Sequence, residues 1–150
     1  MNEEVLRTDK LGKCFSDVDG GVTRVLEEVT LSLNRGERVA VCGESGSGKT
    51  TLLSLLGGLD VPSQGEVYWN KRPLSVLSGK DITRKRCRFI HYIFQNYLLV
   101  EELSVVENML LPVRVRRDKV DGKVYRKAFL WLERLGLAEK AKGSPRLLSG

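Results

Sequence analysis

A run of eight residues in the first third of the chain combines the residue types that bind phosphate. It reads Gly43-Glu44-Ser45-Gly46-Ser47-Gly48-Lys49-Thr50 and matches the pattern G-x-x-x-x-G-K-[ST] at every fixed position. Glycines let a backbone wrap closely around phosphate oxygens, because they adopt torsion angles that other residues resist. The N–H groups of such a loop point inward as an anion nest. Lys49 would reach the β- and γ-phosphates and the Thr50 hydroxyl would ligate Mg²⁺, so the spacing predicts a P-loop.

A P-loop needs a strand before it and a helix after it. Val39–Cys42 is a short continuous apolar run, which predicts a central strand buried on both faces. Leucines after Thr51 recur at helical spacing, and Gly57-Gly58 marks the end of the expected helix. The N-terminal end of that helix would direct its positive dipole at the same phosphate groups.

Further strands are expected around this unit. The alternation of Val29–Leu33 predicts a half-buried strand, and Glu66–Trp69 predicts another. Leu74–Arg88 is polar and predicts a short helix with a loop, whereas the aromatic and β-branched run Phe89–Phe94 predicts a strand that includes His91.

The last third of the chain has helical character. Ser104 and Glu107 are spaced as a capping box. A later apolar stripe at helical spacing ends at Gly136 and consists of Val124, Phe129, Leu130, Leu132 and Leu135. The change from strand-rich to helical predicts a subdomain boundary near residues 95–102.

Composition narrows the class of protein. The 150 residues carry a net charge of +6 and three separated cysteines, which disfavours a disulfide framework or a zinc site and favours a reducing, cytosolic compartment. Basic clusters at residues 84–88 and 114–117 are compatible with anionic partners or with solvated faces. No signal peptide is expected at Met1, and no apolar run approaches the length of a membrane span. Any membrane part would therefore belong to another chain.

Several motifs together resemble the nucleotide-binding domain of an ABC transporter, closest to the lipoprotein-releasing and macrolide-export type. The P-loop reads GESGSGKTTLL, and residues 58–67 are similar to the family's GLD.P..G.V stretch. Phe94-Gln95 resembles the Q-loop, residues 103–108 resemble the segment after it, and Leu148-Ser149-Gly150 resembles the opening of the LSGGQ signature. The resemblance implies an α/β fold: an incomplete P-loop NTPase domain with a β-rich nucleotide-binding part (1–95) and a helical subdomain (96–150).

The resemblance also implies roles for individual residues. Gln95 would act catalytically and, with Thr50, contact Mg²⁺. The residues implied to bind ATP are Phe15, Gly43, Glu44, Ser45, Gly46, Ser47, Gly48, Lys49, Thr50, Thr51, Ser149 and Gly150. Phe15 would stack on adenine, with a simple core residue as the alternative, and Gln95 could instead be an exposed strand-end residue.

At the level of the whole protein, the resemblance implies an ATPase subunit. It would couple ATP to transport by a membrane permease, pair with a second copy, and lie in the cytoplasm on the inner face of the membrane, with no nucleic acid expected. The chain contains no Walker B aspartate, catalytic glutamate or switch histidine by motif, so no turnover is expected from it alone. Two alternatives stay open: a non-catalytic nucleotide-binding remnant, and a soluble ABC-type ATPase that acts on nucleic acid.

Overall fold

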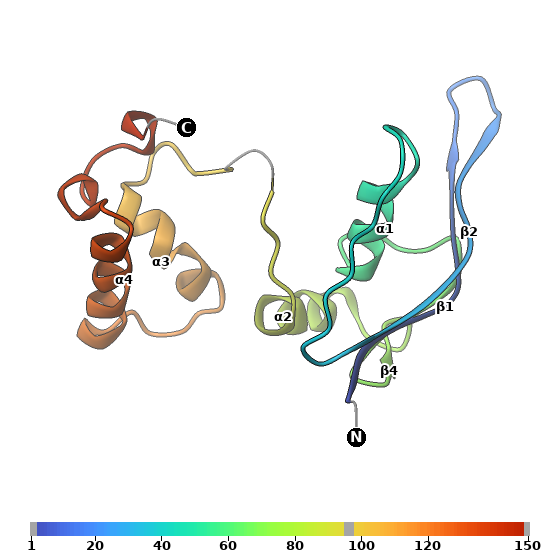
Figure 1. Ribbon diagram of the computed structural model, residues 1–150, viewed down its shortest axis with the longest axis horizontal. Coiled ribbons are helices and arrows are strands. Elements are labelled where there is room, and N and C mark those ends of the chain that lie inside the picture. The colour runs from blue at the N-terminus through green and yellow to red at the C-terminus, as the bar shows by residue number, and fades with distance from the viewer. Residues whose placement is uncertain (1–2, 95–97, 149–150) are drawn as a thin grey trace. The chain divides into compact units, whose positions relative to one another are not determined.

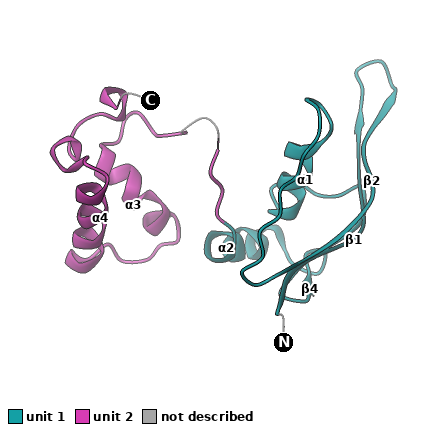
Figure 2. Ribbon diagram, viewed as in Figure 1, with its two compact units in different colours: residues 1–90 teal, residues 91–150 magenta. Residues whose placement is uncertain are grey.

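The computed structural model describes residues 3–94 and 98–148 and divides the chain into two compact units, residues 1–90 and 91–150 (Figure 2). The first unit contains the elements β1 (Glu4–Ser16), β2 (Val22–Asn34), α1 (Lys49–Leu56), β3 (Gln64–Trp69), β4 (Arg72–Pro73) and α2 (Gly79–Phe89). The second contains α3 (Val105–Val115), α4 (Gly122–Arg134) and the short 3₁₀ turns η1 (Ala138–Lys140) and η2 (Pro145–Leu147).

The first unit is built on an antiparallel sheet with the strand order β2-β1-β3-β4. Figure 1 shows β1 and β2 as a long ribbon, which the register joins from Glu4↔Asn34 to Ser16↔Val22. Thr8 is fully buried in β1; its hydroxyl donates to the Val29 carbonyl at 2.9 Å and accepts from the Leu31 N–H at 3.0 Å. The buried hydroxyl is therefore satisfied in both roles and costs little to bury.

Helix α1 packs on this sheet through leucines at helical spacing. The core of the unit comprises Leu6, Leu11, Leu26, Leu52, Leu55, Leu56, Val67, Trp69 and Leu74. Trp69 in β3 is 4% exposed, and its indole Nε1 donates to the Leu56 carbonyl at 2.8 Å. That hydrogen bond satisfies a carbonyl at the C-terminal end of α1, where intrahelical partners run out. The predicted helix after Thr51 and the predicted strands Val29–Leu33 and Glu66–Trp69 are confirmed.

The backbone at Gly65 explains why a glycine occupies this position of the GLD.P..G.V stretch. Its φ is +76°, and a Cβ there would lie 2.2 Å from the Lys10 carbonyl oxygen and 2.4 Å from that of Asp9. Only glycine fits where β3 crosses so close to the backbone of β1.

Two predicted strands are wrong. Residues 39–42 have no regular secondary structure, and Val39 and Val41 are 59% and 40% exposed rather than central and buried. Phe89 is the last residue of α2, while residues 90–94, including the exposed His91, form no strand. The physical reason is pairing: a strand persists only where a neighbour takes up its N–H and C=O groups, and among the described residues no strand pairs with either segment.

Helix α2 has a clear beginning and end. The Ser78 hydroxyl accepts from the Asp81 N–H at 3.2 Å, so Ser78 is the N-cap of the helix. The predicted short helix within Leu74–Arg88 is therefore confirmed, although it extends one residue further.

The second unit is a helical cluster. The capping box predicted for Ser104 and Glu107 is present at the start of α3, with both reciprocal hydrogen bonds formed. The predicted stripe lies on α4, and Gly136 follows that helix with φ of +69°. The core of the second unit comprises Val105, Val106, Leu110, Ala128, Leu132 and Ala141. Leu130 and Leu135, members of the stripe, are instead 52% and 64% exposed.

Candidate phosphate-binding site

The loop before α1 has the conformation that the glycine pattern requires. Gly46 and Gly48 have φ values of +82° and +85°. A Cβ on Gly48 would lie 3.0 Å from both Cγ1 and the carbonyl oxygen of Val25 in β2. The loop therefore turns into the helix while lying directly against the sheet, and a side chain at Gly48 would force it outward.

Lys49 closes the loop on itself. Its Nζ donates to the Gly43 carbonyl at 2.9 Å, to the Glu44 carbonyl, and to the Ser47 hydroxyl at 3.3 Å. An ammonium group has three donors, so all of them are directed into residues 43–47. A phosphate oxygen entering the loop would find this cation already held beside the backbone that must surround it.

The first turn of α1 adds further donors. Helix α1 begins at Lys49, so the N–H groups of Thr50 and Thr51 belong to the first turn and have no acceptor within the helix. No acidic residue lies in that turn, and no cap side chain accepts from it. The positive end of the helix is therefore left available to an anion, and Thr50, the predicted Mg²⁺ ligand, is exposed.

Phe15 lies near the end of β1, in the same unit as the loop. Its side chain is 42% exposed, and it pairs with Thr23 across the β1–β2 ladder. The Lys13 ammonium lies 5.0 Å from the ring centroid. Phe15 is thus not a simple core residue, and it retains exposed aromatic surface on which a planar base could stack.

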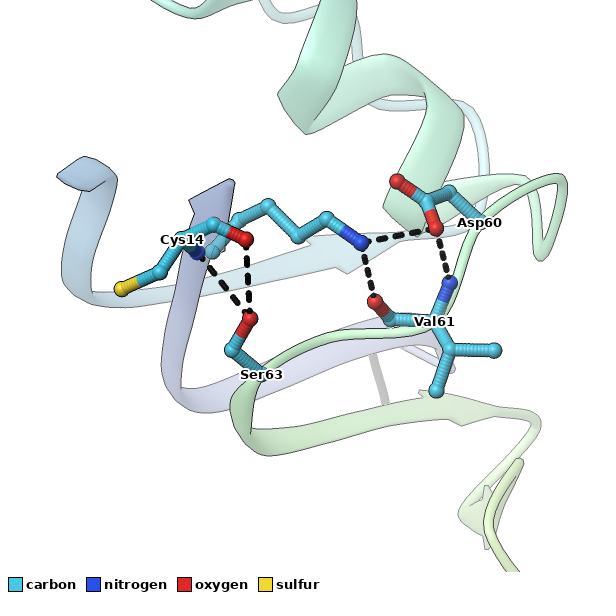
Figure 3. Close-up of polar contacts among 5 residues, drawn as sticks. Cys14, Asp60, Val61 and Ser63 are labelled. Atoms are coloured by element: carbon cyan, nitrogen blue, oxygen red, sulfur yellow. Dashed lines mark hydrogen bonds and ion pairs between the residues drawn. The ribbon is translucent and has the colours of Figure 1, made fainter. Parts of the chain in front are cut away.

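A polar clasp joins the strand that carries Phe15 to the segment that follows α1 (Figure 3). Lys13 Nζ donates to Asp60 Oδ1 and to the Val61 carbonyl, both at 2.8 Å. The N–H of Cys14 donates to the Ser63 hydroxyl at 3.0 Å. The hydrogen bond from Lys13 lowers the pKa of the Asp60 carboxyl, against the opposing effect of partial burial.

The clasp fixes both flanks of the candidate site. Asp60 follows the C-terminal end of α1, whose N-terminal end carries Lys49, and Lys13 lies two residues before Phe15. Sequence reasoning identified Asp60 only as a letter of the GLD stretch and missed Lys13, because nothing local indicates that residues 47 positions apart are paired.

Three predicted site residues, Gln95, Ser149 and Gly150, lie outside the described residues. Among residues 3–94 and 98–148, no group of three or more His, Cys, Asp or Glu side chains could hold a metal ion. A search of the same residues also finds no helix long and apolar enough to span a bilayer.

A cavity of about 610 Å³ is lined by residues such as Leu33, Asn34 and Phe89 and does not include the loop at residues 43–50. A P-loop binds phosphate through backbone N–H groups, so the size of a cavity does not identify a P-loop.

Comparison with known proteins gives consistent matches. A family model described as "ABC transporter" matches residues 26–150. The lipoprotein-releasing system ATP-binding protein LolD of Xylella fastidiosa is 40% identical over 146 residues, covering 97% of this chain and 60% of the relative. The LolD protein of Pseudomonas fluorescens is 38% identical over 151 residues, with 100% and 66% covered. The chain therefore spans between three fifths and two thirds of the length of these relatives.

Solved structures match as well. The dimeric structure of MJ0796, described as a bacterial ABC transporter cassette, superimposes with a TM-score of 0.85 at 30% identity, covering 97% of this chain and 63% of that one. A dimeric post-hydrolysis state of the ATP-binding cassette MJ0796 bound to ADP and Pi gives a TM-score of 0.84 at 31% identity, with 96% and 63% covered.

Proposed function

The chain belongs to the ABC transporter family, and from this premise we propose that it is the nucleotide-binding part of an ATPase subunit that couples ATP to transport by a membrane permease. The family match confirms the resemblance read from the sequence, and the superposition on ATP-binding cassettes confirms the α/β, partial P-loop NTPase fold.

The observation that carries the proposal is the arrangement of Lys49. Its ammonium is held over the Gly43 and Glu44 carbonyls, at the start of a helix with no acid in its first turn. The ammonium group, the N–H groups of the loop and the N-terminal end of the helix together would stabilise the negative charge of a triphosphate. Thr50 would ligate the Mg²⁺ that accompanies ATP, and Phe15 would stack on the adenine. Gln95 would contact the γ-phosphate side through Mg²⁺ or water.

We further propose the partners that follow from the family. The subunit would pair with a second copy, so that Leu148-Ser149-Gly150, which resembles the opening of the signature motif, closes over the nucleotide of the other copy. It would dock on a permease from the cytoplasmic side of the membrane. The 40% identity to LolD supports the lipoprotein-releasing type as the finer assignment. No nucleic acid is part of this function.

By itself, the 150-residue chain is proposed to bind Mg-ATP without turning it over. Phosphoryl transfer needs a carboxylate for Mg²⁺ and a group that orients water. No residue of the printed sequence supplies either role by motif. Steady-state phosphate release above that of a Lys49→Ala chain would contradict this.

Calorimetry with Mg-ATP tests the site directly. Lys49→Ala removes the cation that faces the β- and γ-phosphates, so affinity should fall by about tenfold or more. Lys127→Ala, on the exposed face of α4, removes the same charge and should leave affinity unchanged. Equal affinity of the wild-type and Lys49→Ala chains would refute the P-loop assignment. Loss of binding in both variants would point instead to a general electrostatic effect.

A further inference from the structure

A second concentration of cations lies in the first unit and shares no lining residue with the P-loop. Helix α2 and the β3–β4 hairpin enclose a surface pocket of about 400 Å³. Its lining consists of Trp69, Asn70, Arg72, Arg84, Lys85, Arg88 and Phe89. Four of these residues are cationic and none is acidic. We refer to these seven residues as the α2 basic pocket.

Two independent elements bring the cations together. Arg84, Lys85 and Arg88 lie within one turn of α2, so Arg84 and Arg88 are neighbours on its surface. Arg72 comes from β4, where it pairs with Trp69 of β3. The intervening turn has left-handed torsions at Asn70 (φ +49°) and Lys71 (φ +64°), as in a two-residue hairpin of the type I′ class.

The floor of the pocket is apolar and well anchored. Trp69 is 4% exposed and is tied to Leu56 through its indole N–H. The rings of Trp69 and Phe89 lie in contact, with centroids 5.6 Å apart. A ligand would therefore meet preformed walls rather than order them on binding.

The charges of the pocket are not balanced within the chain. Among the described residues, Asp81 is the only carboxylate in an ion pair with any of the four cations, and it contacts Arg84. Arg84 and Arg88, four residues apart on a helix, repel each other. By contrast, Arg86 of the same helix points elsewhere, since its Nη1 donates to the Gly58 carbonyl. Arg86 of α2 therefore makes a structural hydrogen bond, whereas Arg84 and Arg88 line the pocket.

We propose that the α2 basic pocket binds the phosphate group of an anionic ligand. The guanidinium groups of Arg72 and Arg88 offer planar pairs of donors that match phosphate oxygens, and Arg84 adds the donors that its ion pair with Asp81 does not use. A bound dianion would relieve the repulsion among these cations. Phe89, which is half-buried and packs against the buried Trp69, provides apolar surface for the part of the ligand next to the phosphate. A phospholipid headgroup and a soluble phosphate compound share this chemistry.

The test separates the two sources. The chain carries Lys49→Ala throughout, so that phosphate binding at the P-loop is weakened equally in every variant. One arm measures pyrophosphate binding by calorimetry. The other measures sedimentation with vesicles of phosphatidylglycerol and phosphatidylcholine, against vesicles of phosphatidylcholine alone. The test variant is Arg84→Gln/Arg88→Gln. The control, Arg126→Gln/Lys127→Gln, removes the same charge from exposed positions of α4.

The test variant should lose pyrophosphate affinity by about tenfold or more, or vesicle partitioning by about 30-fold, which is about fivefold for each of the two arginines. Loss in the calorimetric arm assigns a soluble phosphate compound, and loss in the vesicle arm alone assigns a lipid headgroup. Arg84→Lys/Arg88→Lys keeps the charge without the planar fork and should weaken binding to a smaller extent; it also decides the question if the glutamine variant does not fold. Equal losses in test and control variants, or no binding by the parent chain in either arm, would overturn the proposal.

Discussion

Breaking the Lys13–Asp60 clasp should destabilise the first unit by more than a surface ion pair does. Lys13 is 12% exposed and Asp60 is 36% exposed, and a 2.8 Å contact joins their charged atoms. A hydrogen bond to a charged partner contributes about 1.5–3 kcal/mol. Since Asp60 is partly solvated, we expect a coupling of about 1 kcal/mol between the two side chains. Asp60→Asn alone should cost about 1–2 kcal/mol, because it leaves the Lys13 ammonium half-buried without its counter-charge.

The assay is a double-mutant cycle of Lys13→Met and Asp60→Asn, measured by urea unfolding. Trp69 is buried in the first unit, so a Trp131→Phe background makes its fluorescence a probe of that unit alone. Arg35 and Glu3, which are 79% and 61% exposed and 3.3 Å apart, provide the control pair, for which the coupling should be near zero. Equal couplings in the two cycles would refute the reasoning.

The pH dependence of the clasp has a definite sign. The folded-state pKa of Asp60 is lowered from its ordinary value of 3.8, chiefly by the hydrogen bond from Lys13. The stabilisation is therefore fully present above the unfolded-state pKa and is lost as pH falls through the lower folded-state value. The difference in unfolding free energy between wild type and Asp60→Asn should stay constant from about pH 5 to 7 and shrink below about pH 4. A difference that shrinks between pH 5 and 7 would show that another group is responsible.

Three further predictions concern packing and assembly. Gly65→Ala should cost about 3 kcal/mol or more in urea unfolding, because it adds a backbone clash to a left-handed φ, whereas Gly36→Ala, with φ of +81° and open space around it, should cost only about 1 kcal/mol. Ser104→Ala should cost about 1 kcal/mol by removing the cap of α3, measured by helical circular dichroism on heating; an unchanged melting curve would mean that the cap is redundant. The exposed Val39, Val41 and Leu53 should make the isolated chain prone to association, and a monodisperse monomer with a sharp melting transition in size-exclusion and thermal experiments would contradict that.

The conformation of the loop before α1 was predictable from the sequence because it is set locally. Gly43–Thr50 is contiguous, and the torsions, the cation and the helix N-terminus are all set within a few residues. The cap at Ser104 and the helix after Thr51 were predictable for the same reason, since capping and helical periodicity act over three or four positions.

Contacts between distant residues were decided only by the tertiary structure. Val39–Cys42 has the composition of a buried strand, but composition does not supply a neighbour, and the segment is exposed where no described strand pairs with it. Lys13 and Asp60 form the clasp because β1 passes the end of α1, which no local pattern records. The α2 basic pocket likewise depends on a hairpin turn at Asn70 that returns Arg72 to a helix beginning seven residues later. Loop torsions, helix caps and helical periodicity are determined by neighbouring residues in the sequence. Strand pairing, burial and the clustering of charges depend on which distant segments the fold brings into contact.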